Sequence, residues 1–293
     1  MDEWQDWIPC RVEGEEFPCL CELSISNCPK LEGKFPHHLP SLEKLSSETC
    51  QQLVVSIPNH PVLQVLKIVG CKEVVHGSVK VEKLIIKNCE KLTSLCEDEL
   101  MSLATLEIKI QSCPSLVNMK LKSTLRKLTI SYCSALESLE FVIDEGGASS
   151  TSSLLMNEEN LSCIGNNNAP LLEHLEISYC PSLKCVSTIV DLAAKLKRLQ
   201  IQSCPNLTSL SPKDTLPTTL KVLWLNDCPK LKSVDKLDKD TLLEDLFIWG
   251  CEKLSRNNFA KQRDLPSSVA VESSFKTWRR MIIVPFKNSA LEQ

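Results

Sequence analysis

Ten of the sixteen cysteines in this 293-residue chain recur at nearly even intervals. The successive intervals are 22, 21, 18, 24, 20, 47, 24, 24 and 23 residues, and the one long interval is about twice the others. Such a period is typical of a repeat architecture, in which each unit buries its apolar face against its neighbours. The ten periodic cysteines are Cys28, Cys50, Cys71, Cys89, Cys113, Cys133, Cys180, Cys204, Cys228 and Cys251.

Apolar residues keep a fixed distance from each periodic cysteine. If the cysteine is position nine of a unit, positions one, four, six and twelve are apolar in 38 of 40 cases, whereas the hydrophobic content of 43% would give about 17. The unit reads L-x-x-L-x-I-x-x-C-x-x-L, which is the pattern of a leucine-rich repeat. Side chains at positions four and six point to one side of a short strand, and stacked strands join them into a continuous core.

The predicted fold is therefore an α/β-type leucine-rich-repeat solenoid, or horseshoe, with a parallel β-sheet on its concave face. The returns between strands are about ten residues long and polar, and they keep no 3.6-residue period. We expect them to be irregular or 3₁₀ segments on the convex side. Proline follows the periodic cysteine in five units and helps to end the strand there.

The cysteines do not have the spacing of a metal or redox centre. No C-x-x-C pair occurs, and no histidine lies at ligand spacing from a cysteine. A thiol is small and tolerates burial, so the periodic cysteines are interpreted as structural, and we expect neither a metal nor a cofactor. The alternative is a redox or metal protein that uses the sixteen cysteines, which predicts retained metal or several thiols with a low pKa.

Two units, Leu172–Leu183 (LEHLEISYCPSL) and Leu196–Leu207 (LKRLQIQSCPNL), resemble the repeats of plant intracellular nucleotide-binding leucine-rich-repeat (NLR) disease-resistance proteins. The opening, Trp4–Trp7 followed by Phe17–Leu20, resembles a segment inside the repeat region of the coiled-coil class related to RPP13-like proteins. The resemblance covers about residues 1–255. It implies a chain that senses a pathogen effector, or a host protein altered by one, and that holds a nucleotide-binding switch domain at rest.

The chain departs from that family in lacking its phosphate-binding loop. Gly33-Lys34 is followed by Phe35, and no glycine stands at the required place before it. No coiled-coil heptads are found either, so we expect a repeat region that is truncated from a receptor. The predicted organisation is a partial N-terminal coil at 1–19, about six repeat units at 20–140, a flexible insertion or a degenerate coil at 141–169, about four units at 170–255 and an irregular C-terminal tail at 256–293.

Positions three, five and seven of each strand flank the buried positions and form the candidate binding face. In the first half of the chain this face carries a basic stripe, which predicts docking of an acidic protein surface. The alternative is a solvated face that discourages lateral contacts between sheets. The stripe consists of Lys44, Lys67, Lys83, Lys87, Lys109 and Lys127.

The same face becomes aromatic in the last two units, where Trp224, Phe247 and Trp249 occupy positions five and seven. Large aromatic side chains are costly to expose and dominate the energetics of interfaces. We therefore predict a protein-binding patch. The alternative is that the tail at 256–293 folds back and covers these side chains.

The remaining composition narrows the classes of function. No window of about 18 apolar residues could span a membrane, and no secretory signal is visible, so we expect a cytoplasmic chain. The net charge of −4, with no aromatics among the lysines, argues against a nucleic-acid partner. No catalytic motif is present, and we expect no enzyme. The favoured function is protein recognition in plant immunity, and the alternative is an adaptor for a ubiquitin ligase or another interaction scaffold.

Overall fold

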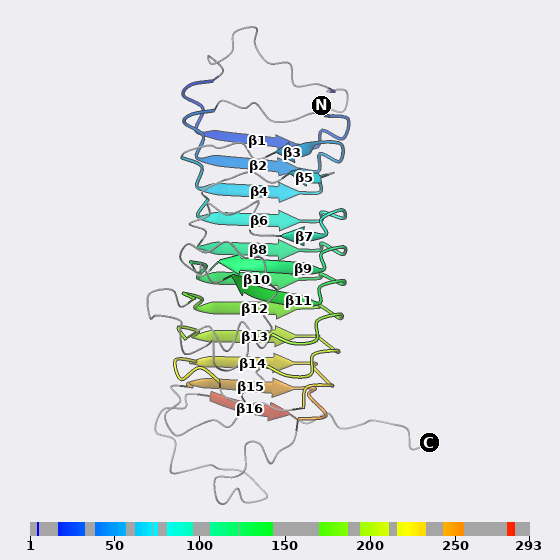
Figure 1. Ribbon diagram of the computed structural model, residues 1–293, viewed down its shortest axis with the longest axis vertical. Helices are drawn as coiled ribbons and strands as arrows, with labels where there is room; N and C mark the ends of the chain where they lie inside the picture. Colours follow the sequence, from blue (N-terminus) through cyan, green and yellow to red (C-terminus); the bar gives the residue numbers. More distant parts are fainter. Residues whose placement is uncertain are drawn as a thin grey trace, which may run out of the picture.

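The chain folds into a stack of coils in the computed structural model, with a long parallel sheet along one side (Figure 1). The structure describes residues 5, 17–32, 39–56, 62–71, 73–75, 81–95, 106–122, 124–142, 170–186, 194–210, 216–232, 243–254 and 280–284. Among the described residues there is no helix.

The long sheet has eleven parallel strands, one from each coil, in the order of the chain. This is the sheet that the repeat pattern predicts, and it defines a leucine-rich-repeat type of solenoid. Its strands are β1 (Glu22–Ser26), β2 (Lys44–Glu48), β4 (Val65–Val69), β6 (Lys83–Lys87), β8 (Glu107–Gln111), β10 (Lys127–Ser131), β12 (His174–Ser178), β13 (Arg198–Gln202), β14 (Val222–Asn226), β15 (Asp245–Trp249) and β16 (Arg280–Val284).

The register of the sheet places equivalent repeat positions side by side. Leu128 at position four, for example, pairs with Ile108 of β8 and Leu175 of β12. Leu84, Leu128, Leu199 and Leu246 lie in this one row, and all four are buried. Each buried leucine contributes about 1.5–3 kcal/mol to stability before conformational entropy is counted. The row therefore supplies a large share of the stability of the stack.

Each strand ends in the same turn, which the periodic cysteine completes. Position eight has a left-handed backbone in all ten repeat units, with φ between 49° and 63°. At position nine the cysteine Sγ donates a hydrogen bond to the carbonyl oxygen two residues earlier, at 3.3–3.8 Å. Eight of these cysteines are at most 2% exposed. The expectation that these cysteines tolerate burial is thus confirmed for the coils inside the stack.

Short strands also occur on the return side, where the sequence predicts only irregular or 3₁₀ segments. They are β3 (Val54–Ser56), β5 (Glu73–Val75), β7 (Ser94–Leu95), β9 (Asn118–Lys122) and β11 (Ser138–Val142), and they form a sheet of two strands and a sheet of three. The physical reason is an alternation of polar and apolar residues. In β9, for instance, Met119 and Leu121 are buried while Asn118 and Lys120 face outward.

The C-terminal tail corrects one prediction. Arg280–Val284, which the sequence predicts to be irregular, forms β16 and pairs in parallel with β15. Met281 lies beside Leu246, and Ile283 lies beside Ile248, so the apolar alternation of the repeat returns without its cysteine. The rest of 256–293 lies outside the described residues.

Two further boundaries are only partly described. Strand β11 ends at Val142, so the first two residues of the predicted insertion at 141–169 belong to a strand. Residues 143–169, including the predicted degenerate coil, lie outside the described residues. At the N-terminal end, the backbone N–H of Glu32 donates to the carbonyl oxygen of Gln5 at 2.8 Å, which joins one residue of the predicted partial coil to the first repeat unit.

Candidate functional site

The candidate site is the outward side of the long sheet, called here the exposed face. It consists of positions three, five and seven of each strand, because positions four and six point into the core. The burial of the strands alternates accordingly, as in β6 and β8. All the residues that the sequence singles out lie on this face, in two groups. The first group, over β2 to β10, is Lys44, Lys67, Lys83, Lys87, Lys109 and Lys127, and the second, over β14 and β15, is Trp224, Phe247 and Trp249.

Carboxylates of neighbouring coils pair with several of the predicted lysines. The Lys67 Nζ lies 2.6 Å from the Glu48 Oε1, and Glu107 lies between Lys83 at 3.0 Å and Lys127 at 3.2 Å. Sequence reasoning missed these two glutamates, although both occupy positions of the same face. They reduce the positive potential that an acidic partner would meet, because each ion pair neutralises a cation at short range.

The ionisation of these carboxyls reflects their partners. The hydrogen bond from Lys67 is the largest influence on Glu48 and lowers its pKa. Burial acts to raise the pKa of Glu107, but the hydrogen bonds from Lys83 and Lys127 outweigh it and hold that pKa below its ordinary value. Both carboxyls are therefore ionised at neutral pH and remain paired. In the described part of the chain, Lys87 and Lys109 are the two lysines of the stripe that make no ion pair.

The three aromatic residues form a cluster, called here the aromatic patch. The rings of Trp224 and Phe247 are stacked with their centroids 4.2 Å apart, because these residues are direct partners in the register of β14 and β15. Trp224 is 39% exposed and Trp249 is 42% exposed. The described part of the tail, β16, lies beside β15 in the sheet and leaves both indoles accessible.

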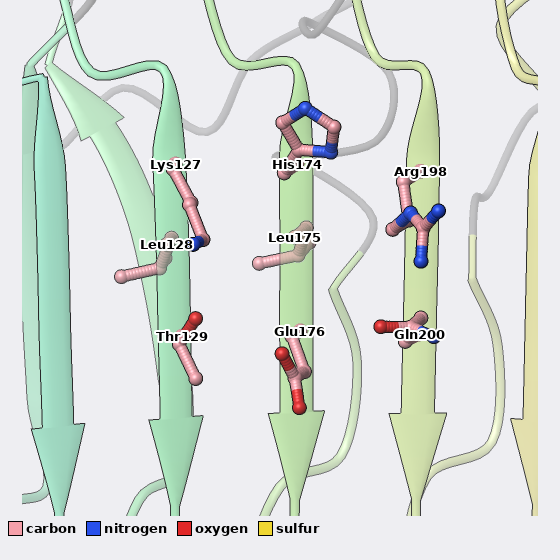
Figure 2. A pocket seen from close by; sticks show the side chains of 8 residues that line it. All are labelled: Lys127, Leu128, Thr129, His174, Leu175, Glu176, Arg198 and Gln200. Carbon is pink, nitrogen blue, oxygen red and sulfur yellow. The ribbon is translucent and has the colours of Figure 1, made fainter.

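A shallow depression of about 330 Å³ lies between the two groups, over β10, β12 and β13. Figure 2 shows Lys127, His174 and Arg198 at one level of these three strands, and Thr129, Glu176 and Gln200 at the next. Leu128 and Leu175 complete its floor. Of these residues the sequence analysis singled out Lys127 alone. The sequence does contain a signal for this row, because three basic side chains occupy position three of successive coils. The interval of 47 residues between Cys133 and Cys180, however, hides the fact that the coils of Lys127 and His174 are neighbours.

Two tyrosines mark the carboxyl ends of the same strands. Tyr132 and Tyr179, both at position eight, are stacked with ring centroids 4.5 Å apart and planes inclined by 6°. Tyr132 is 50% exposed, and Tyr179 is 39% exposed. The Gln202 Nε2 of β13 donates a hydrogen bond to the Tyr179 hydroxyl at 3.1 Å, which places this hydroxyl at the border of the exposed face.

The exposed face offers cations, carboxylates and aromatic rings. No group of three or more histidine, cysteine, aspartate or glutamate side chains is placed to hold a metal ion within the described residues. Burial raises the pKa of Cys71 and of Cys204 to about 11, so both thiols are protonated at neutral pH and are poor nucleophiles and poor metal ligands. In the described part there is also no helix long and apolar enough to cross a membrane.

The fold and this face define a leucine-rich-repeat solenoid, and comparisons with known proteins agree with the class. The chain is 29% identical over 148 residues to the RPP13-like protein 1 of Arabidopsis thaliana, described as a disease resistance protein. It is 41% identical over 56 residues to the Arabidopsis thaliana disease resistance protein At3g14460. The first match covers 47% of this chain and the second covers 19%. The chain therefore fits the leucine-rich-repeat region of a plant NLR.

These matches span only a small part of the relatives, 12% of the length of the RPP13-like protein and 4% of the other. No family model matches the chain, and no solved structure matches it.

Proposed function

We propose that the chain is a protein-recognition module of plant defence that binds its partner through the exposed face and acts without catalysis. The observation that carries this proposal is the aromatic patch. Trp224 and Trp249 are exposed on a sheet face, Phe247 stacks against Trp224, and tryptophan is among the residue types most enriched in the side chains that dominate binding energy. The names of the two Arabidopsis relatives support a role in disease resistance.

The resemblance to NLR receptors gives the proposal its finer form. In a full receptor, this face would sense a pathogen effector or a guarded host protein in the cytoplasm, and it would contact the nucleotide-binding domain in the resting state. Lys87 and Lys109 supply cations for such a contact, because neither is neutralised by a carboxylate of the described residues. Charge of this kind increases the rate and the specificity of association more than the affinity.

The experiment compares the wild-type chain with the triple variant W224A/F247A/W249A. Each tagged protein is expressed in leaves, and the captured proteins are quantified by mass spectrometry. A matched control, K184A/K232A, changes two exposed lysines that lie outside the exposed face. We expect the triple variant to lose partners that both the wild type and the control retain, with the midpoint of thermal unfolding unchanged. Equal capture by all three proteins would contradict the proposal, and a large loss of thermal stability in the triple variant would indicate that the aromatics serve packing instead.

A further inference from the structure

Three basic residues from neighbouring coils form one row on the exposed face, over the depression. Lys127 pairs in register with His174, and His174 pairs with Arg198. Adjacent strands are about 4.8 Å apart, so the row spans about 10 Å across the coils. No other three successive coils of the described sheet carry a basic residue at position three.

The charges around this row leave it net positive. Lys127 is paired with Glu107, and Glu173 is held outside the row by Lys197 at 2.6 Å and Arg126 at 3.9 Å. Arg198 makes no ion pair within the described residues.

The one carboxylate in the depression is that of Glu176, at position five of the central strand. An anionic group that lies over position three therefore meets Arg198 and His174 directly, and Glu176 lies one step further along the strand (Figure 2).

The other end of the same strip is aromatic. Tyr132 and Tyr179 follow β10 and β12 five positions after Lys127 and His174, which is about 16 Å along an extended strand. Between the two ends lie Thr129 and Ser131 of β10 and Glu176 and Ser178 of β12. Because the tyrosines are already stacked on each other, a partner side chain that packs against them orders little of the protein on binding.

We propose that this strip, over β10, β12 and β13, binds an extended acidic segment of a partner protein, with a carboxylate on the Lys127–His174–Arg198 row and an apolar side chain on the Tyr132–Tyr179 pair. The inference rests on the proposed function in that the exposed face binds protein. It adds a second site, distinct from the aromatic patch, and the chemistry of the segment that occupies it. Charge complementarity selects an acidic segment over a basic one, which Arg198 would repel.

His174 makes this binding dependent on pH. Burial and the neighbouring cations Arg198, Lys127 and Lys197 lower the pKa of the free imidazole, while Glu173 acts in the opposite direction and Glu176 lies on the same strand. A bound carboxylate stabilises the imidazolium and raises this pKa. The acidic segment is therefore bound more tightly as the pH falls toward the pKa of the free imidazole, provided that the segment itself stays ionised.

The test follows the imidazole of His174 by NMR in protein labelled at histidine, with H174Q used to assign its signal. The probe is a short synthetic peptide that carries a pair of aspartates and, about four residues away, a phenylalanine. A second peptide with the reversed sequence is tested as well, because the direction of the segment on the strip is not fixed. We expect saturating probe to raise the pKa of His174. Substitution of asparagine for aspartate in the probe, or of alanine for phenylalanine, is expected to weaken binding about two- to fivefold.

Matched protein variants locate the effect. R198Q is expected to weaken binding of the acidic probe about two- to fivefold, whereas K195Q, which removes the same charge from the same coil outside the depression, is expected to leave it unchanged. E176Q is expected to strengthen binding by removing a repelling carboxylate. An unchanged titration of His174 in the presence of the probe would overturn the inference, and an equal effect of inorganic phosphate alone would overturn its claim of a peptide segment.

This outcome is separable from that of the proposed function. If the titration of His174 does not respond while W224A/F247A/W249A still abolishes capture, the strip is not a binding site but the exposed face remains one. If the strip binds the probe while the triple variant captures every partner, the aromatic patch is dispensable and recognition lies at β10 to β13.

Discussion

Substitution of Leu128 by alanine tests the energetic importance of the stacked leucine row. Leu128 is fully buried between Ile108 and Leu175, in the middle of the solenoid. Removing three buried carbon groups forfeits about 2.4 kcal/mol of transfer free energy at about 0.8 kcal/mol each. The neighbours on both sides hold the cavity open, so we expect a total loss of about 3–5 kcal/mol in the free energy of unfolding.

Leu23→Ala is the matched control, because Leu23 occupies the same repeat position in the first repeat unit. It is only half-buried, and its one partner among the described strands is Leu45. Solvent reaches the space that its side chain leaves, so we expect a loss of about 1–2 kcal/mol. The free energies are measured by urea denaturation followed by circular dichroism. Equal losses for the two variants, or a loss below about 1 kcal/mol for Leu128→Ala, would refute the account of a continuous core.

Two other substitutions test the ion pairs and the turns. Glu107→Gln is expected to lower stability by about 0.5–1 kcal/mol at neutral pH. Because the folded state lowers the pKa of Glu107, its stabilisation is complete above the unfolded pKa of about 4.3 and is lost as the pH falls through the lower, folded value. The stabilities of the wild type and the variant should therefore converge at acidic pH in a pH series of urea denaturation, and a constant difference would argue against the pairing with Lys83 and Lys127. Gly70→Ala is expected to cost about 1 kcal/mol, measured by thermal unfolding, because φ at Gly70 is 62° while the added Cβ would meet Thr49 Cα at an ordinary 3.7 Å; a cost several times larger would indicate a clash rather than backbone strain.

The repeat fold was predictable from sequence because its determinants are local and recur. Each unit has its own alternating strand, its own cysteine and its own turn, so a departure of one unit from the repeat pattern does not change the prediction for the others. Even the exceptional Ser47 at position six remains in register, buried between Ile25 and Ile68. Its hydroxyl forms a hydrogen bond with the Cys71 thiol at 3.2 Å, which satisfies the polar group.

The features that the sequence did not predict depend on contacts between different coils, or lie in a coil that has no cysteine at position nine. Strand β16 keeps the alternation of Met281 and Ile283 but has no cysteine at position nine, so its register could not be read. The pairing of Lys83 and Lys127 with one glutamate requires three coils to be superimposed. The depression around His174 could be predicted only if the coils before and after the long interval that precedes Cys180 were known to be neighbours.

The reactivity of the thiols tests the stacked-coil arrangement most directly. The account predicts that brief alkylation of the native protein, mapped by mass spectrometry, modifies the exposed Cys19, Cys21 and Cys185. The periodic cysteines inside the stack, such as Cys133 and Cys204, should react only after denaturation, because they are fully buried. Labelling of Cys133 and Cys204 in the native protein as rapidly as Cys185 would contradict it.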